Sequence, residues 1–433
     1  MYFFISTFGC KVNQYDSQII LELFLKSGFK QTRDSKLADI AIVNSCTVTK
    51  ESSKKVLRYI NRIREENKNA VIALVGCLPE AFADEIRKIL DIDIILGNKD
   101  KFNILKKVKE YLNFKNKDFE IKLNNENEKY SPLSISSFGN RTRAFVKIQD
   151  GCNQFCSYCI IPYARGRSRS KKLEDVYAEV KSITSAGYKE IVLVGINLAM
   201  YGKDFENKLN LCNVLENISK IESLKRIRLS SIEPQFMDEK AVRELSNFKK
   251  LCPHFHVSLQ SGSNNTLKRM NRHYTASDYA KIVENIHKFF NNASITTDVM
   301  VGFPGETEKD FKESLNFVEK MSFYKVHVFP FSVRKGTKAQ TFPDKIKNDV
   351  KKSRAKEMLG LSEKLKERFL KSQIGKTVSV LFEKMTDKNI NTGHAPNYVT
   401  VHLKGNSNLE GKILDVKLGS NNREACLGQI VAK

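Results

Sequence analysis

Short apolar runs alternate with helical patterns along most of this chain, and this alternation limits its possible folds more than any other feature. In residues 1–115 the runs Tyr2–Ser6, Ala38–Asn44 and Ala70–Val75 are typical of buried strands. A helix is expected from Asp16, as its cap, to Lys26. Strands that alternate with helices form parallel sheets. We therefore predict a doubly wound α/β domain in this part of the chain.

A second alternating region follows a polar, weakly patterned stretch at residues 116–139, which we interpret as a linker. Helical patterns separate most of its apolar runs. Six of these runs read as strands: Ala144–Gln149, Glu190–Gly195, Arg226–Ser230, Phe255–Leu259, Ile295–Val301 and Val326–Phe331. We predict an open (β/α)6 partial barrel over residues 140–370, with its chemistry at the C-terminal ends of the strands.

The last part of the chain, residues 371–433, changes character, because short strand-like runs there alternate with Gly and Asn turns. The runs are Thr377–Phe382, Tyr398–Leu403, Lys412–Lys417 and Leu427–Ala432. This pattern favours a small all-β barrel of the size of an OB-fold. The whole chain is thus predicted to be an α/β multidomain protein that ends in a β-barrel.

Three cysteines follow the three predicted N-terminal strands. Cys10, Cys46 and Cys77 each lie just beyond the C-terminal end of one strand, in turn-like surroundings. Because the C-terminal ends of parallel strands share one edge of a sheet, we expect these thiols to converge. The alternative is three independent buried cysteines, since free cysteine is commonly a core residue.

The strongest motif is the Cx3Cx2C loop of Cys152, Cys156 and Cys159, directly after the first strand of the second region. Thiolates are suited to iron–sulfur clusters or zinc. Structural zinc sites use four ligands, and no fourth Cys or His lies nearby in the sequence. A cubane held by three cysteines leaves one iron open to bind a reactant. A zinc site completed by a distant residue is the alternative.

Other residues at or near predicted strand ends are candidates to contact a cofactor or substrate. They are Gly195, Asn197, Ser230, Glu233, Gln260, Asp298 and Gly302. Cys212, Cys252 and Cys426 match no cluster motif, so we expect free thiols. His254 and His256 alternate along a strand and are expected to pack rather than to bind a metal.

The formal net charge of +24 indicates a polyanionic partner such as nucleic acid, although a generally lysine-rich composition would also produce it. Eight basic residues lie between 141 and 172, against Asp150 alone. The candidates for RNA contacts are Arg143, Arg165, Arg167 and Arg169, with Tyr398 as a ring on which a base could stack. The alternatives are a solvated basic loop and an ordinary core tyrosine.

No apolar run approaches the ~18 residues that span a bilayer, and no secretory signal is recognisable at Met1. The nine cysteines are an odd number, which argues against a secreted, disulfide-linked protein. We expect a cytoplasmic protein without a membrane partner.

The Cx3Cx2C loop resembles that of the radical S-adenosylmethionine (radical SAM) superfamily. Further motifs resemble the methylthiotransferases within it, in the domain order of that family. These motifs are Phe8–Ser17, Asn44–Thr49, Gly76–Cys77, Gly151–Gly166, Gln260–Ser263 and Val301–Thr307, followed by a TRAM-type RNA-binding barrel. The resemblance covers nearly the whole chain.

This resemblance implies two 4Fe–4S clusters. One, on Cys152, Cys156 and Cys159, would bind S-adenosylmethionine and cleave it to a 5′-deoxyadenosyl radical. The other, auxiliary cluster, on Cys10, Cys46 and Cys77, would carry the sulfur for insertion. One cofactor molecule would methylate this sulfur and another would supply the radical that activates an inert C–H bond. An electron donor and a sulfur source are implied, and we expect a monomer.

The family has branches that act on different substrates. Lys11–Tyr15, Arg143–Gly151 and Pro162–Gly166 are most similar to the branch that modifies threonylcarbamoyladenosine beside the tRNA anticodon. Other branches act on isopentenyladenosine in tRNA or on an aspartate of a ribosomal protein. A different possibility is an RNA-binding iron–sulfur protein without this activity.

Overall fold

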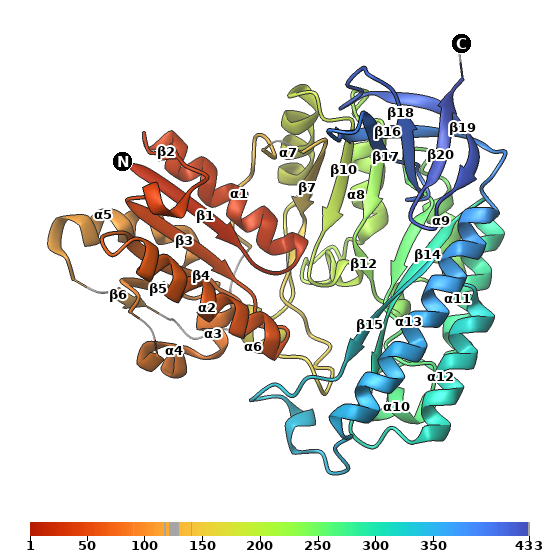
Figure 1. Cartoon of the computed structure of the whole chain (residues 1–433), viewed down its shortest axis with the longest axis horizontal. Coiled ribbons are helices and arrows are strands. Elements are labelled where there is room, and N and C mark those ends of the chain that lie inside the picture. Colours follow the sequence, from red (N-terminus) through yellow and green to blue (C-terminus); the bar gives the residue numbers. More distant parts are fainter. Residues whose placement is uncertain (90, 117, 121–129, 140, 432–433) are drawn as a thin grey trace.

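The structure is a computed structural model that describes residues 1–89, 91–116, 118–120, 130–139 and 141–431 (Figure 1). An N-terminal sheet domain lies on one side of the molecule, two further sheets form the middle, and a small β-barrel ends the chain. Within these residues, no helix has both the length and the apolar character needed to cross a membrane.

The N-terminal sheet is parallel and has the strand order β2-β1-β3-β4-β5-β6. Its strands are β1 (Tyr2–Thr7), β2 (Lys30–Gln31), β3 (Ile40–Ser45), β4 (Val71–Gly76), β5 (Ile94–Leu96) and β6 (Asp118–Glu120). The three predicted strands are confirmed as β1, β3 and β4. The other three were missed because each is only two or three residues long, too short to show a period.

Helices cover both faces of this sheet, as predicted for a doubly wound domain. They are α1 (Lys11–Lys26), α2 (Lys50–Glu66), α3 (Cys77–Ala81), α4 (Ala83–Ile89) and α5 (Ile104–Phe114), with the 3-10 helices η1 (Ser35–Leu37) and η2 (Lys101–Asn103). Side chains alternate along β3: Ile40 and Ile42 pack with α1 and α5, whereas Ala41 and Val43 pack with α2.

The first helix begins earlier than predicted. Cys10 is its N-cap, so the prediction that Asp16 caps it is wrong. Asp16 lies inside α1 and is fully buried. Its carboxylate forms ion pairs with other parts of the fold instead of binding the N-terminal N–H groups of the helix.

The strands predicted for the middle of the chain are all present, but they belong to two parallel sheets. They are β7 (Arg143–Lys147), β10 (Glu190–Val194), β11 (Arg226–Leu229), β13 (His254–Val257), β14 (Ser294–Val301) and β15 (Lys325–Pro330). The sheets have the orders β11-β10-β7 and β12-β13-β14-β15, where β12 is Ser231–Ile232. The chain passes from the first sheet to the second at Ser230, between β11 and β12. The predicted single sheet of six strands is therefore not confirmed.

Helices follow most of these strands and pack on their outer side (Figure 1). They are α7 (Leu173–Ser185), α8 (Leu211–Ser219), α9 (Glu239–Ser246), α11 (Ala276–Phe289), α12 (Glu308–Met321) and α13 (Asn348–Lys371). Two further short helices of this region are α6 (Ile161–Arg165) and α10 (Asn264–Arg269). The remaining short elements are β8 (Gln149–Asp150), β9 (Arg169–Ser170), η3 (Leu198–Met200), η4 (Pro234–Phe236) and η5 (Lys338–Thr341).

The C-terminal barrel is closed, with the strand order β16-β17-β18-β20-β19. Its strands are β16 (Thr377–Met385), β17 (Ile390–His394), β18 (Thr400–Lys404), β19 (Ile413–Asn421) and β20 (Cys426–Ile430). β17 was not predicted, because its sequence Ile-Asn-Thr-Gly-His has little apolar character. Of the range predicted as the last strand, Ala432 lies outside the described residues.

Two buried arginines of β11 attach this barrel to the middle of the molecule. Arg226 donates to the Ser379 carbonyl at 2.7 Å, and Arg228 donates to the Pro396 carbonyl at 2.9 Å. Both also form ion pairs with Glu190 of β10. The barrel therefore packs through satisfied buried charges rather than through an apolar patch alone.

The stretch at residues 116–139, predicted to be a linker, includes β6 at the edge of the N-terminal sheet. Ile135 and Phe138 are buried in the core of the central region. The part of the stretch from 121 to 129, and residue 117, lie outside the described residues.

Candidate active site

The loop that carries Cys152, Cys156 and Cys159 is held at both ends by backbone hydrogen bonds. β8 precedes it and pairs with β9, which follows it. The Cys152 N–H donates to the Gly166 carbonyl at 3.1 Å, and the Cys159 N–H donates to the Cys156 carbonyl at 3.0 Å. The three thiols are thus presented from one tight loop.

Hydrogen-bond donors point at two sulfurs of this loop. The Gln154 N–H and Asn197 Nδ2 approach Cys152 Sγ at 3.4 and 3.8 Å. Arg272 Nη1 approaches Cys156 Sγ at 3.3 Å. Such donors favour a charged thiolate over a neutral thiol. The surroundings therefore suit metal-bound sulfur.

The structure also brings Cys10, Cys46 and Cys77 to one edge of the N-terminal sheet. Cys10 caps α1, Cys46 follows β3, and Cys77 begins α3. A methyl group in place of the Gly9 hydrogen would lie only 3.1 Å from Cys46 Sγ. The backbone at Gly9 thus approaches Cys46 so closely that only glycine fits there.

Burial raises the pKa of two thiols in each group, Cys10 and Cys46 in the first and Cys152 and Cys159 in the second. Desolvation is the largest cause for Cys10 and Cys46, and Cys77 adds a repulsive charge interaction for each of them. Burial likewise raises the pKa of Cys159 to about 12. A bound cation would favour the thiolate forms of these cysteines, as happens when a thiol binds a metal.

No three Cys, His, Asp or Glu side chains in the described part of the chain converge on a point where a single metal ion would bind. A cubane cluster has a different requirement, because each cysteine binds its own iron at a separate corner. The two predicted cluster sites therefore remain predictions.

A cavity of about 240 Å³ lies between the two cysteine regions. Cys159 and Tyr158 line it from the Cx3Cx2C loop, and Thr49 lines it from the segment that follows Cys46. Gln260 and Asp298 line it from the second central sheet. Thr49 and the segment Phe329–Ser332 also line an adjoining groove of about 990 Å³.

Four of the residues predicted to contact a cofactor or substrate lie at the cavity or beside the Cx3Cx2C loop. Gln260 and Asp298 line the cavity, and Asn197 is close to Cys152. Glu233 pairs with Arg272, whose guanidinium reaches Cys156. These four residues are therefore at the predicted site.

The other three predicted contact residues are not among the residues that line the cavity. The Ser230 hydroxyl is buried and has no hydrogen-bond partner among the described residues, so it is available to a ligand. Gly195 packs against the side chain of Gln149, which also accepts from the Asn197 N–H at 2.8 Å. Gly302 packs beneath Lys351.

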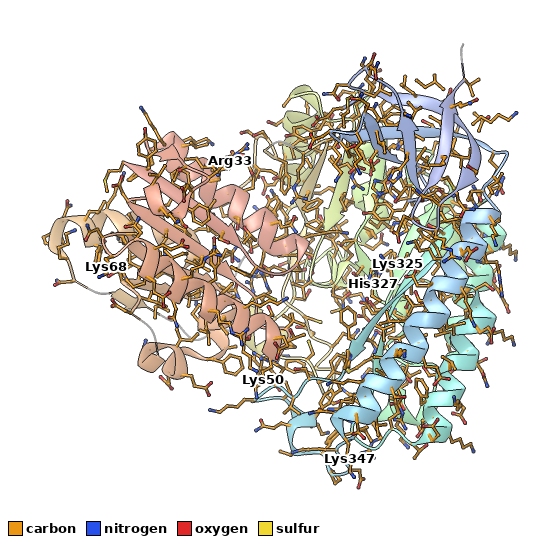
Figure 2. The ribbon with its side chains drawn as sticks, viewed as in Figure 1. Arg33, Lys50, Lys68, Lys325, His327 and Lys347 are labelled. Atoms are coloured by element: carbon orange, nitrogen blue, oxygen red, sulfur yellow. The ribbon has the colours of Figure 1, made fainter. Side chains whose placement is uncertain are left out.

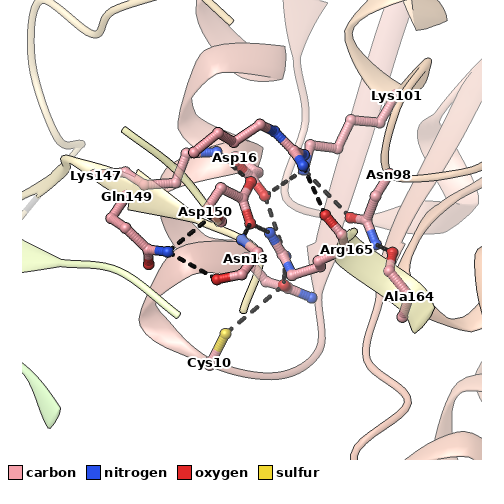
Figure 3. Close-up of polar contacts among 12 residues, drawn as sticks. Cys10, Asn13, Asp16, Asn98, Lys101, Lys147, Gln149, Asp150, Ala164 and Arg165 are labelled. Atoms are coloured by element: carbon pink, nitrogen blue, oxygen red, sulfur yellow. Dashed lines mark hydrogen bonds and ion pairs between the residues drawn. The ribbon is translucent and has the colours of Figure 1, made fainter. Parts of the chain in front are cut away.

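A buried charge network joins the N-terminal domain to the Cx3Cx2C loop, and no sequence pattern predicted it (Figure 3). Lys101 and Lys147 each donate to the Asp16 carboxylate at 2.6 Å. Arg165 donates to Asp150 at 2.9 Å and approaches Asp16 at 3.3 Å. All five side chains are at most 7% exposed. The network holds α1, which begins next to Cys10, against the strand that leads to Cys152.

The network contains three cations but only two carboxylates. The charges of Lys101, Lys147 and Arg165 together hold the pKa of Asp16 at about 2, against the opposing effect of its burial. Cys10 and Cys77 are among the groups whose charge stabilises protonated Arg165. The excess positive charge therefore lies beside the N-terminal thiols, where it would stabilise their thiolate forms.

The structure corrects two of the predicted RNA contacts. Arg165 is only 1% exposed and belongs to the buried network, so it cannot reach an RNA backbone. Arg143 is paired with Glu383 of the barrel at 2.9 Å. Arg167, in contrast, is exposed beside the loop, and its guanidinium lies over Phe155 at 4.8 Å. Arg169 is half-buried and donates to the Arg165 carbonyl.

Tyr398 is likewise not available to stack on a base. Its ring stacks on His254 with 4.5 Å between ring centres and on His394 with 4.6 Å. It forms part of the contact between the barrel and β13. His254 thus packs, as predicted, whereas His256 is half-buried and faces Asp298 at 3.2 Å.

Cys212, Cys252 and Cys426 are buried free thiols, as predicted. Cys212 lies in α8, Cys252 precedes β13 and Cys426 begins β20. Their burial accounts for them as small core residues.

We predict that Gly151→Ala disrupts the Cx3Cx2C loop. Gly151 has φ +73°, and an added Cβ would lie 1.9 Å from the Arg167 carbonyl oxygen, a backbone atom that cannot rotate away. Iron bound at this loop and cofactor cleavage should each fall at least about tenfold. Gly187→Ala is the control, because Gly187 has φ +99° but nothing within 4 Å. Equal behaviour of the two variants would show that the close contact is unimportant.

Two regions of the chain match two different protein families. Residues 146–318 match the radical SAM superfamily. Residues 2–97 match an uncharacterized protein family, UPF0004. A solved radical S-adenosylmethionine methyltransferase, TsrM from Kitasatospora setae, is similar in fold with a TM-score of 0.57 at 12% identity, covering 78% of this chain and 77% of its own.

Curated relatives are similar over nearly their full length. The threonylcarbamoyladenosine tRNA methylthiotransferase MtaB of Thermotoga maritima is 41% identical, covering 93% of this chain and 91% of the relative. The MtaB protein of Bacillus subtilis is 36% identical, covering 95% and 92%. The tRNA-2-methylthio-N(6)-dimethylallyladenosine synthase of Clostridium tetani is also 36% identical, covering 96% and 93%.

Proposed function

The chain belongs to the radical SAM tRNA methylthiotransferases, and from this premise we propose that it inserts a methylthio group at C2 of N6-threonylcarbamoyladenosine next to the tRNA anticodon. The observation that carries the proposal is a cavity lined by Cys159 of the Cx3Cx2C loop and by Val48 and Thr49, which follow Cys46 of the other cysteine group. A substrate atom in that cavity would be within reach of groups bound at both.

We propose that Cys152, Cys156 and Cys159 hold the 4Fe–4S cluster that binds S-adenosylmethionine, and that Cys10, Cys46 and Cys77 hold an auxiliary 4Fe–4S cluster. Together these groups supply a carbon-centred radical and the sulfur to be inserted. The donor sets support this assignment, because each consists of three thiols and leaves one iron of a cubane without a protein ligand.

The chain's own residues are placed to orient these groups. Asn197 and Arg272 donate to the sulfurs of the Cx3Cx2C loop. Gln260 and Asp298 present polar groups into the cavity, where they are placed to bind S-adenosylmethionine or the substrate. We propose the same role for Ser230, whose buried hydroxyl lacks a partner in the described residues.

The threonylcarbamoyl substrate is supported by the relatives named for it, of which one is 41% identical. The second candidate substrate is isopentenyladenosine in tRNA, because a relative named for dimethylallyladenosine is 36% identical. The predicted motifs at Lys11–Tyr15 and Pro162–Gly166 favour the first.

Further parts of the proposal concern architecture and partners. The two central sheets would together form the open (β/α)6 half-barrel of radical SAM enzymes, and the five-stranded C-terminal barrel would be a TRAM-type RNA-binding domain. Turnover needs an electron donor and a sulfur source. We propose a cytoplasmic monomer.

Nucleoside analysis of tRNA tests this function. In a strain without the gene, mass spectrometry should detect threonylcarbamoyladenosine but no methylthio derivative, provided that no paralogue is present. Complementation with the wild-type gene should restore the derivative. Unchanged methylthio-threonylcarbamoyladenosine in the deletion strain would refute the substrate, and loss of the isopentenyl derivative instead would assign the second candidate.

A further inference from the structure

The face of the second central sheet that looks toward the N-terminal domain is polar and basic. In the parallel pairing of β14 with β15, Thr296 is opposite Lys325 and Asp298 is opposite His327. Paired residues share a face of a sheet. The opposite face carries Ile295, Val299 and other apolar side chains that pack in the core. Figure 2 shows Lys325 and His327 one above the other on β15, in the middle of the molecule.

Positive charge exceeds negative charge on this inner face. His256 Nε2 lies 3.2 Å from Asp298 Oδ2, which accepts a hydrogen bond from it, and the His256 ring lies 5.6 Å from that of His327. Burial lowers the pKa of His327, and the nearby charges of His256, Lys325 and Lys11 lower it further, while Asp298 opposes them. Five titratable groups therefore act on one another here, and only one of them is a carboxylate.

The two lysines of this group have no carboxylate partner among the described residues. Lys11 and Lys325 are exposed and form no ion pair in the described part of the chain, whereas the more buried Arg143, Arg226 and Arg228 each pair with Glu190. A bound anion would relieve the repulsion within the group.

The basic group lies next to the proposed reaction site. Lys11 follows Cys10 directly, and Asp298 lines the cavity together with Cys159. A base whose reacting carbon occupies the cavity would have its substituents within reach of the inner face. The ligand chemistry that fits this face is an anion carried close to the reacting carbon.

We propose that Lys11, Lys325 and His327 bind the carboxylate of the threonylcarbamoyl group and so select this substrate. The inference rests on the proposed function. An isopentenyl group has no charge and would leave Lys11 and Lys325 without an anionic partner, so the same residues would discriminate against it. The group could instead bind a phosphate of the tRNA backbone, which is also an anion, and the experiment separates these sources.

The test measures binding of two tRNAs of identical sequence to the full-length protein, reconstituted with its clusters. One tRNA carries threonylcarbamoyladenosine and the other carries unmodified adenosine at the same position. For Lys325→Gln and Lys11→Gln we expect affinity for the modified tRNA to fall about tenfold each, with little change for the unmodified one. Lys68→Gln is the control, since Lys68 is exposed on the N-terminal domain (Figure 2).

Three other outcomes would each contradict a different part of the argument. An equal loss of affinity for both tRNAs would overturn the proposal in favour of a phosphate contact. Wild-type protein that prefers the modified tRNA, with unchanged preference in both variants, would refute the role of these lysines but keep the proposed function. Wild-type protein that neither prefers nor methylthiolates the modified tRNA would refute the proposed function itself.

Discussion

Simultaneous replacement of Cys10, Cys46 and Cys77 by alanine should abolish methylthiolation but leave cleavage of S-adenosylmethionine intact. The variant loses all three thiols at the edge of the N-terminal sheet, whereas the Cx3Cx2C loop keeps its own. Iron content after anaerobic reconstitution should fall to about half, because one of two cubanes is lost. Formation of 5′-deoxyadenosine reports on the remaining cluster.

The reciprocal variant is Cys156→Ser, which removes a sulfur that Arg272 approaches at 3.3 Å. It should abolish 5′-deoxyadenosine formation and methylthiolation together. The control replaces Cys212, Cys252 and Cys426, which are buried and match no cluster motif. Iron content that stays unchanged in the first variant, or falls as far in the control, would contradict the assignment of two clusters.

Asp16→Asn should destabilise the protein by about 3–5 kcal/mol, the usual cost of breaking a buried ion pair on one side. The substitution leaves Lys101, Lys147 and Arg165 buried with Asp150 as their only carboxylate within the network. Arg165→Met should cost less, because it leaves two cations facing two carboxylates. Urea denaturation followed by circular dichroism measures the difference between the two.

The control for this prediction is Glu51→Gln. Glu51 lies in the first turn of α2, with its side chain 71% exposed and 3.5 Å from Lys54. An exposed pair of this kind contributes at most about 1 kcal/mol. A stability loss for Asp16→Asn no larger than that of the control would show that the network does not stabilise the fold. A larger loss for Arg165→Met than for Asp16→Asn would contradict the charge count.

Prediction of the fold from the sequence succeeded where a local period was long enough to read. β3 and β4 are six residues long and wholly buried, so their apolar runs are unmistakable. β5 is apolar but only three residues long, and β17 has little apolar character. They form because neighbouring strands supply their hydrogen-bond partners.

The charged side chains show even more clearly what local sequence patterns cannot predict. Arg165 stands in a basic stretch of the sequence, which favours an exposed RNA contact, yet it is buried against Asp16, 149 residues away in the chain. Nothing in a local pattern distinguishes it from Arg167, which is exposed. Only the packing of the N-terminal domain against the Cx3Cx2C loop does so.

The sequence by itself determined the cysteine motifs, the parallel α/β architecture and the expected position of three thiols at the ends of β1, β3 and β4. These depend on spacing within short segments, which the backbone geometry of strands and helices enforces. Tertiary structure alone decided the partners of Asp16, the engagement of Tyr398 by His254 and His394, and the basic inner face around Lys325. Those contacts join residues far apart in the chain, so their energies depend on how whole domains pack.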